Sequence, residues 1–286
     1  YKTILGPHTK KGWYRIERLP PDPHKHSPRS TPTVSVNQLE TSTQIKREAV
    51  QRLHRRLGHM SKTKMRAVLG IQPLYGLQPK DVDLLQACRG CALGKPRRDT
   101  HKKTDGKRQT EKAFGTHLSS DNTAEQSVPS KGGKKVINLT VDHYSNYWWT
   151  AALRAKKESV DRLRYVTTQE LGGVTVLIRT DQGGEYLNHA MAKLLQEIGA
   201  QHETSASGVS QQNGRAEKGI QDCLRMVRTV LADSALPLSL WGEALRYVTH
   251  EHNNAPCFSN PDLASPHFMR HGSHPDYKRS HAFGQH

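Results

Sequence analysis

Apolar and polar residues alternate along the second half of the chain in a way that predicts strands and helices in succession. The strand-like runs cover residues 114–120, 136–141, 147–153 and 174–180. The helical patterns cover residues 155–170, 187–199, 214–235 and 238–252. Strands followed by helices favour an α/β layer architecture.

The run that leads to Asp181 combines a strand pattern with a polar end. Val174, Val176 and Ile178 occupy alternate positions in it, as expected for one face of a strand. Such a strand brings Asp181 to its carboxyl end, which is where open α/β sheets bind their ligands.

The helical pattern over residues 214–235 carries Glu217 near its start. The helix is expected to begin after the turn-forming pair Asn213-Gly214 and to end near Ala235. Its apolar residues recur at spacings of 4, 3 and 4, which predicts one buried stripe made of Ile220, Leu224, Val227 and Leu231. Glu217 lies on that stripe, where a charge is costly unless it is paired or bound to a cation.

Asp181 and Glu217 have 35 residues between them, and a third carboxylate upstream could join them. Hard oxygen ligands suit Mg²⁺ or Mn²⁺, so convergence of these carboxylates predicts a divalent metal site. The pattern alone leaves two candidates for the third ligand. Asp121 follows a short strand-like run, and Asp142 ends a clearer one that begins at Val136.

A second group of potential metal ligands lies upstream. His54 and His59 flank four residues, Cys88 and Cys91 flank two, and 28 residues separate the pairs. Two imidazoles and two thiolates suit a tetrahedral zinc ion. The apolar residues between the pairs would form a small core that needs the metal for stability: Met65, Val68, Leu69 and Leu74. The alternative is that the cysteines are incidental thiols in a chain with 17 histidines.

Charge favours a polyanionic partner. The 286 residues carry a formal net charge of +17, and nucleic acid is the first candidate for such a partner. Residues 95–112 contain eight Lys and Arg, so this segment is either a solvated linker or a flexible contact to phosphates. The residues proposed for phosphate contact are Lys95, Arg97, Arg98, Lys102 and Lys103.

The first 45 residues are interpreted as mostly extended or disordered, because prolines cluster between Pro20 and Pro32. No apolar run has the length of a membrane span, and none resembles a signal peptide. Four cysteines, two of them in the predicted zinc site, favour a reducing compartment.

Four motifs occur in order along the chain: Leu118-Ser-Ser-Asp121, Thr140-Val-Asp142-His-Tyr-Ser145, Thr180-Asp181-Gln-Gly-Gly-Glu-Tyr186 and Gln211-Gln-Asn-Gly-Arg-Ala-Glu217. With these motifs and the His-His-Cys-Cys arrangement, the chain from about Leu53 to Phe283 resembles the polyproteins of copia-type retrotransposons. In this family a small pre-integrase zinc module precedes the integrase catalytic core.

The resemblance implies a ribonuclease H-like fold with a mixed five-stranded sheet and flanking helices. It divides the chain into an extended segment (1–45), a helical zinc module (46–96), a basic linker (97–112) and an integrase core (113–286). Because the chain begins at Tyr1 and ends near the family's core boundary, it is expected to be a piece of a longer polyprotein.

The resemblance also selects the catalytic residues. It implies that Asp121, Asp181 and Glu217 bind two Mg²⁺ or Mn²⁺ ions about 4 Å apart, which assist phosphoryl transfer. Asp142 becomes a structural residue and Glu185 a loop residue near the site. The implied reactions are trimming of element DNA ends and their transfer into target DNA by a homo-oligomer, in a cytoplasmic particle and then the nucleus. Gln211, Gln212 and Asn213 are expected to lie on a loop near the DNA.

Three departures from the family pattern keep other functions open. Gln182 stands where Asn is usual, Asn146 replaces a common Arg, and no Gly-Pro follows Asp121. A decayed element could leave a zinc-stabilised module that binds nucleic acid without catalysis. A nuclease on the same fold would cleave DNA without joining strands.

Overall fold

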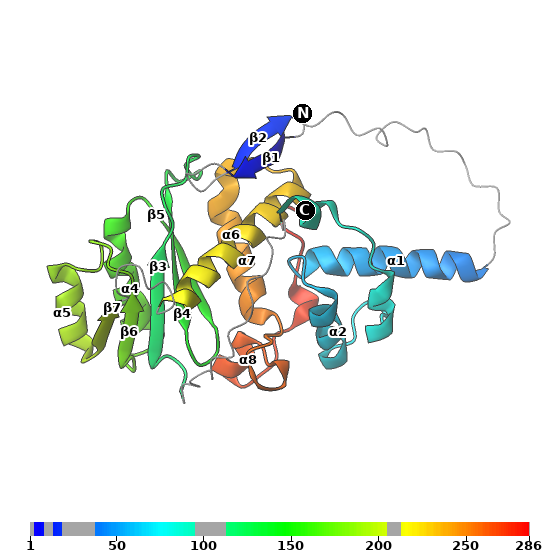
Figure 1. Ribbon diagram of the computed structural model, residues 1–286. Coiled ribbons are helices and arrows are strands. Elements are labelled where there is room, and N and C mark those ends of the chain that lie inside the picture. Colours follow the sequence, from blue (N-terminus) through cyan, green and yellow to red (C-terminus); the bar gives the residue numbers. More distant parts are fainter. Residues whose placement is uncertain (1–2, 9–13, 19–37, 95–112, 205–212, 286) are drawn as a thin grey trace.

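The computed structural model describes residues 3–8, 14–18, 38–94, 113–204 and 213–285 (Figure 1). Figure 1 shows a sheet with flanking helices beside a helical module that contains α1 and α2. Within the described ranges, no helix is both long enough and apolar enough to cross a membrane.

The sheet has five strands in the order β5-β4-β3-β6-β7. Its strands are β3 (His117–Asn122), β4 (Val136–Asp142), β5 (Trp148–Leu153), β6 (Leu177–Thr180) and β7 (Gln201–Thr204). The pairs β3–β4 and β4–β5 are antiparallel, whereas β3–β6 and β6–β7 are parallel. The predicted mixed five-stranded sheet is therefore confirmed.

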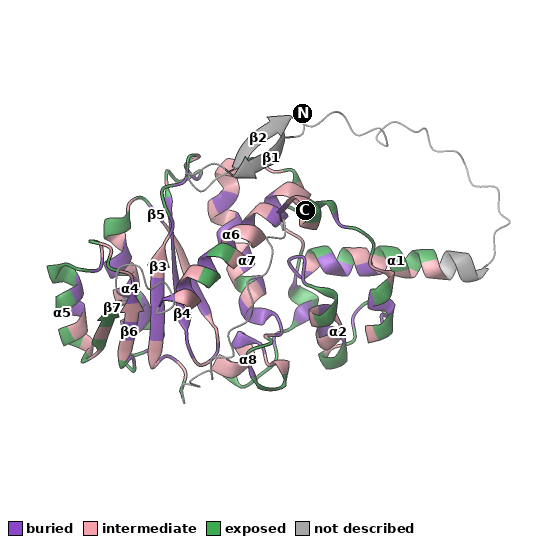
Figure 2. Ribbon diagram, in the orientation of Figure 1, coloured by how far each residue is buried: buried purple, intermediate pink, exposed green. Residues whose placement is uncertain are grey.

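Helices cover both faces of the sheet, and this makes β4 buried along its whole length (Figure 2). On one face, α6 (Gly214–Ser234) lies across β3 and β4, and α7 (Trp241–Asn254) packs on β5. The other face is covered by α4 (Ser159–Tyr165) and α5 (His189–Ile198), which form a separate apolar cluster with Ile178 of β6. This layering confirms the predicted α/β architecture.

Helix α6 follows its predicted pattern closely. Ile220, Val227 and Leu231 are buried in the main core, and Leu224 packs against that core from a half-buried position. The helix ends at Ser234, and Ala235 adopts a left-handed conformation with φ of 55°. The predicted end of the helix is thus confirmed.

The N-terminal module consists of α1 (Gln38–Arg56), α2 (Lys62–Ile71), the 3₁₀ helix η1 (Pro79–Leu84) and α3 (Arg89–Gly94). The four residues predicted to form its core, Met65, Val68, Leu69 and Leu74, are all buried. The same apolar cluster includes Ala255 and Tyr277 from the far end of the chain. The module and the sheet domain therefore share a core.

Short elements complete the fold. The remaining helix is α8 (Pro266–His271). Single turns of 3₁₀ helix are η2 (Lys156–Glu158), η4 (Leu238–Leu240), η5 (Pro261–Leu263) and η6 (Tyr277–Arg279), and a π-helical turn, η3 (Val166–Glu170), extends α4.

Two elements begin at other residues than the sequence pattern indicates. Residues 1–45 contain the extended strands of an antiparallel hairpin, β1 (Thr3–His8) and β2 (Tyr14–Arg18), but α1 already begins at Gln38. No proline follows Pro32 in this segment, so nothing in the sequence prevents a helix from that point. Strand β6 begins at Leu177 rather than at 174, and Val174 and Val176 are exposed, because the chain leaves a Gly172-Gly173 turn just before it joins β3.

Glu251 of α7 is buried where the module meets the sheet domain. A Cβ on Gly58, at the end of α1, would lie 3.0 Å from the Glu251 Cβ. Burial raises the pKa of Glu251 to about 8, although a hydrogen bond with Ser280 opposes the shift. The folded protein therefore holds a proton on Glu251 between about pH 4.5 and pH 8 that the unfolded chain releases. The free energy of unfolding consequently falls as the pH rises through this range.

Replacing Glu251 with Gln should remove this dependence, because the amide imitates the protonated acid. We expect Glu251→Gln to stay close to the original chain near pH 5 and to exceed its free energy of unfolding at pH 9 by on the order of 5 kcal/mol. Urea unfolding at several pH values measures this. Glu125→Gln, at an exposed position, is the control, and equal pH profiles for the original chain and Glu251→Gln would contradict the prediction.

Candidate functional site

Parallel pairing of β3 with β6 sets two of the predicted carboxylates side by side. Leu118 pairs with Ile178, and Ser119 pairs with Arg179. Two residues beyond the second pair, β3 reaches Asp121 and the chain leaving β6 reaches Asp181. Both carboxylates thus lie at the same edge of the sheet, at the carboxyl ends of neighbouring strands.

Helix α6 brings Glu217 to this edge. Glu217 lies in the first turn of α6 and is half-buried. The preceding Asn213 donates a hydrogen bond from Nδ2 to the carbonyl oxygen of Ser120, at 3.4 Å, and so fixes the start of α6 beside the end of β3.

The charges of the three residues affect one another. Burial, together with the negative charges of Asp181 and Glu217, raises the pKa of Asp121 to about 7 against the opposing effects of the Asn122 N–H and Lys156. The structure therefore places Asp121, Asp181 and Glu217 near enough for their charges to interact. Like charges in a partly buried site repel unless a cation joins them, so the group suits cation binding.

Tyr186 anchors a buried polar network behind the carboxylates. Its hydroxyl lies 3.0 Å from Ser120 Oγ and accepts hydrogen bonds from the Nδ2 atoms of Asn122 at 3.2 Å and Asn138 at 3.1 Å. The network ties the end of β3 to β4 and to the loop after β6. We did not identify Asn138 from the sequence, although its amide lies in a strand that is buried along its whole length.

Glu185 is a fourth acidic group at this edge. Its Oε1 accepts a hydrogen bond from Asn122 Nδ2 at 3.3 Å and lies 3.3 Å from Lys156 Nζ. Burial opposes ionisation, but hydrogen bonds and the Lys156 charge outweigh it and hold the Glu185 pKa below its ordinary value. A Cβ on Gly183 would lie 2.7 Å from Glu185 Oε2 and 3.0 Å from Asp181 Oδ1. Glycine therefore leaves room for both carboxylates on one loop.

Asp142 lies away from this group. It pairs with Leu118 at the start of β3, whereas Asp121 pairs with Leu139 near the strand's other end. The Asp142 carboxylate is fully buried and accepts hydrogen bonds from the Gly115 N–H at 2.9 Å, the Ser145 N–H at 2.7 Å and the Ser145 hydroxyl at 2.6 Å. Asp142 therefore holds the turn after β4 in place, as expected of a structural residue.

The four predicted zinc ligands also converge. The ligand atoms of His54, His59, Cys88 and Cys91 all lie within 4.8 Å of one another. His54 Nε2 lies 3.3 Å from Cys91 Sγ, and His59 Nδ1 lies 3.4 Å from Cys88 Sγ. Neighbouring hydrogen bonds, above all one with Cys91, outweigh burial and hold the Cys88 pKa far below its ordinary value. This donor set and its spacing fit one tetrahedral zinc ion.

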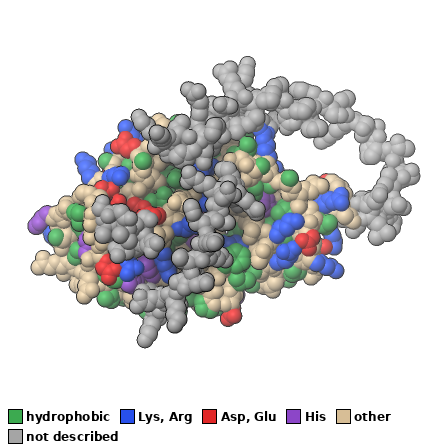
Figure 3. All heavy atoms as spheres, in the orientation of Figure 1, with side chains coloured by type: hydrophobic (Ala, Val, Ile, Leu, Met, Phe, Trp, Pro, Cys, Tyr) green, Lys and Arg blue, Asp and Glu red, His purple; other side chains and the backbone are tan. Residues whose placement is uncertain are grey.

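Most of the predicted DNA contacts lie outside the described residues. These are Lys95, Arg97, Arg98, Lys102, Lys103, Gln211 and Gln212. Asn213 is described: it is 1% exposed, and its amide donates a hydrogen bond to the Ser120 carbonyl oxygen. Figure 3 shows Lys and Arg side chains spread over the visible face of α1 and α2, among a few acidic ones.

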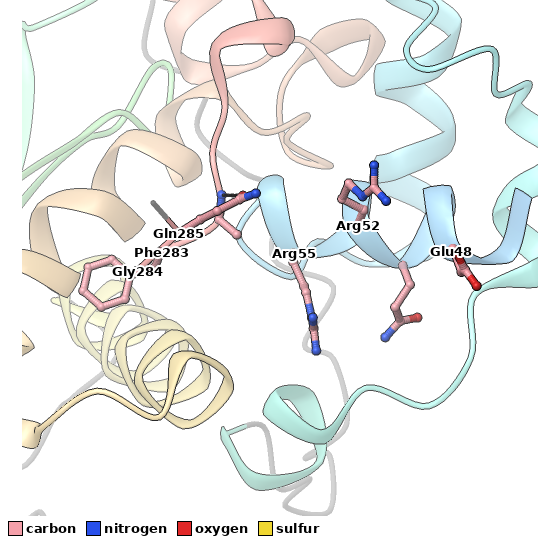
Figure 4. A pocket seen from close by; sticks show the side chains of 8 residues that line it. Glu48, Arg52, Arg55, Phe283, Gly284 and Gln285 are labelled. Carbon is pink, nitrogen blue, oxygen red and sulfur yellow. Dashed lines mark hydrogen bonds between the residues drawn. The ribbon is translucent and has the colours of Figure 1, made fainter. Parts of the chain in front are cut away.

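A cavity of about 510 Å³ lies between α1 and the C-terminal segment. Figure 4 shows Glu48, Arg52 and Arg55 on the α1 side and residues 283–285 on the other. None of the three carboxylates lines it, so it is separate from the candidate active site.

Comparison of the sequence with known proteins shows similarity to one domain family and to several transposon polyproteins. Residues 111–210 match the family model of the integrase core domain, a range that includes Asp121 and Asp181 and ends before Glu217. The chain is 27% identical over 206 residues to a retrovirus-related Pol polyprotein from transposon TNT 1-94 of Nicotiana tabacum, which covers 71% of this chain and 15% of that protein. It is also 27% identical over 290 residues to the transposon Ty1-DR4 Gag-Pol polyprotein of Saccharomyces cerevisiae, covering 92% of this chain and 16% of that protein. The chain thus spans only about a sixth of the length of these relatives.

The different environments of Asp121 and Asp142 predict opposite effects on stability. Asp142→Ala should lower the free energy of unfolding by about 3 kcal/mol, because it leaves buried N–H donors without an acceptor. Asp121→Asn should leave it unchanged or raise it at pH 8 without divalent metal, because it removes a buried charge. Chemical denaturation measures both, and a destabilised Asp121→Asn beside a stable Asp142→Ala would reverse the two assignments.

Proposed function

Because the chain is a member of the copia-type retrotransposon polyproteins and carries their integrase core, we propose that it joins DNA ends to target DNA in a reaction that depends on divalent metal. The observation that carries this proposal is that Asp121 and Asp181 lie at the carboxyl ends of the paired strands β3 and β6, where the charges of Asp181 and of Glu217 on α6 act on Asp121. Integrase cores belong to the polynucleotidyl transferase type of enzyme, which acts on DNA.

The three carboxylates would hold two Mg²⁺ or Mn²⁺ ions. Hard oxygen donors from one aspartate on each strand and one glutamate on α6 suit either metal. When bound, such ions activate water or a DNA 3′-hydroxyl and stabilise the leaving oxygen. The raised pKa of Asp121 supports this assignment, since the described residues supply too little positive charge to balance its buried carboxylate.

The surrounding residues would fix the carboxylates in place. The hydrogen bonds of Tyr186 hold the end of β3 against β4 and the loop after β6. Lys156, paired with Glu185, adds a positive charge that keeps part of the acidic cluster neutralised. These contacts would reduce the rearrangement needed when metal and DNA bind.

The proposed DNA substrate, oligomeric state and cellular location rest on the same family resemblance and on the positive charge of the chain. The basic segment 97–112 would contact DNA phosphates and so provide affinity without sequence preference. Two DNA ends must meet for integration, so we propose that the protein acts as a homo-oligomer, first in a cytoplasmic particle and then in the nucleus.

Two of the departures from the family motifs, Asn146 and Gln182, leave the proposed active site intact. Asn146 adopts a left-handed conformation with φ of 59° in the turn after β4, which asparagine tolerates better than arginine. Gln182 is exposed beside Asp181. Neither removes a carboxylate, and this favours the integrase over the catalytically silent, nucleic-acid-binding alternative.

Replacing one carboxylate with its amide should abolish joining without abolishing DNA binding. With Mn²⁺ and a labelled branched oligonucleotide, we expect Asp181→Asn and Glu217→Gln to lower strand joining by roughly 10²-fold or more. Asp222→Asn is the matched control, because Asp222 lies on α6 and pairs only with neighbouring Lys218 and Arg225 in the contacts described. Joining by Asp181→Asn at the original rate would refute the assigned site. If the original chain and all variants bind DNA but none joins strands, the result would favour the catalytically silent alternative.

Protons should compete with metal at this site. Because burial raises the pKa of Asp121 to about 7, acidification below that value protonates a proposed ligand. We expect Mn²⁺ affinity, measured by titration calorimetry, to fall by up to about tenfold per pH unit below pH 7. Affinity that stays constant between pH 8 and pH 6 would contradict the prediction.

A further inference from the structure

Helix α6 contacts the zinc centre as well as the candidate active site. Glu217 occupies its first turn, and Asp233 lies near its last residue, Ser234. Asp233 Oδ2 is 3.6 Å from His59 Nε2 and 3.3 Å from Arg55 Nε. A carboxylate from the sheet domain therefore meets a histidine of the predicted zinc site in the N-terminal module.

The close approach of α3 to α6 makes this contact possible. A Cβ on Gly90 would lie 2.8 Å from the Asp233 Cβ and 3.0 Å from the Thr229 carbonyl oxygen. A Cβ on Gly94 would lie only 2.4 Å from the Thr229 Cα. Two glycines, one turn apart, thus let the short helix with Cys91 pack directly on the backbone of α6.

The orientation of His59 leaves one ring nitrogen for the thiols and one for Asp233. Gly58 and His59 both have positive φ, 58° and 61°, and the turn directs Nδ1 of His59 to Cys88 and Cys91, at 3.4 Å and 3.8 Å. Nε2 then faces Asp233. His54 has the opposite arrangement: Nε2 approaches Cys91, and Nδ1 lies 3.1 Å from the Met60 carbonyl oxygen.

A metal-bound imidazole carries its hydrogen on the other ring nitrogen and usually donates it to a carbonyl or a carboxylate. For His54 that acceptor, the Met60 carbonyl, lies within the module. For His59 the group that faces the free nitrogen is the Asp233 carboxylate, 3.6 Å away on a helix of the sheet domain. We propose that Asp233 supports the zinc site as the acceptor for His59, and that zinc binding thereby holds the N-terminal module against the end of α6.

The contact with Arg55 cannot replace this role. Arg55 is 51% exposed and lines the cavity between α1 and the C-terminal segment (Figure 4). Solvent screens such a pair, which contributes little to stability. His59, in contrast, is 3% exposed, so its interaction with Asp233 is shielded from water.

Zinc affinity tests the proposal without DNA and without catalysis, so its outcome is independent of the proposed function. For the full chain, competition with a chromophoric chelator gives the Kd for zinc. We expect Asp233→Asn to weaken zinc binding by about 10- to 100-fold. Asp222→Asn on the same helix and Arg55→Gln should each stay within about twofold of the original chain.

Hydrogen exchange provides a second measurement, and its main comparison, with and without zinc, uses only the original chain. Removing zinc from the original chain should increase amide exchange at residues 227–234 of α6 more than at residues 241–248 of α7. In Asp233→Asn, exchange at 227–234 should already be raised with zinc bound.

Three results would overturn the proposal. The first is a Kd for Asp233→Asn equal to that of Asp222→Asn. The second is an Arg55→Gln variant that loses as much affinity, which would assign the effect to the ion pair. The third is exchange in α6 that does not respond to zinc, and this result applies even if Asp233→Asn fails to fold.

Discussion

Burial of α6 on two sides is the constraint on which both candidate sites depend. Toward the sheet, a Cβ on Gly219 would lie 3.0 Å from the Leu139 side chain. Toward the module, Gly94 lies against the Thr229 backbone. Both contacts are close, so a shift of α6 that loosens its packing on the sheet would also disturb its packing on the module, and the reverse. Glu217 at one end and Asp233 at the other are therefore fixed relative to the strands and to the zinc ligands.

At the sheet edge, the described acidic residues carry more negative charge than the described cations near them balance. Burial and two neighbouring carboxylates raise the pKa of Asp121 to about 7, while Lys156 is the nearby cation that opposes this shift. The hydrogen bonds of Tyr186 keep the strand end in place despite this repulsion. Such an arrangement lowers stability in the free protein and becomes favourable once cations bind, which is the property expected of a metal-dependent active site.

The sequence predicted the elements whose signal is local, and it missed those that depend on distant partners. The stripe through Ile220 and Val227 identified α6, and the alternation up to Asp142 identified β4, because a buried face leaves a periodic trace. The helix from Gln38 and the exposed Val174 were not predicted, since tertiary contacts decide where an element starts. Asn138 and Asp233 carry no motif of their own; the hydroxyl and the imidazole that they bind become their neighbours only after folding.

The central claim is that Asp121, Asp181 and Glu217 form one metal site. The most direct test is X-ray diffraction at the manganese absorption edge, from crystals of the full chain soaked in Mn²⁺. We expect anomalous density between the three carboxylates beside the carboxyl ends of β3 and β6, and its loss in Asp181→Asn. Well-ordered carboxylates with no manganese between them, at a concentration that saturates Mn²⁺-dependent binding in solution, would show that they do not form one metal site.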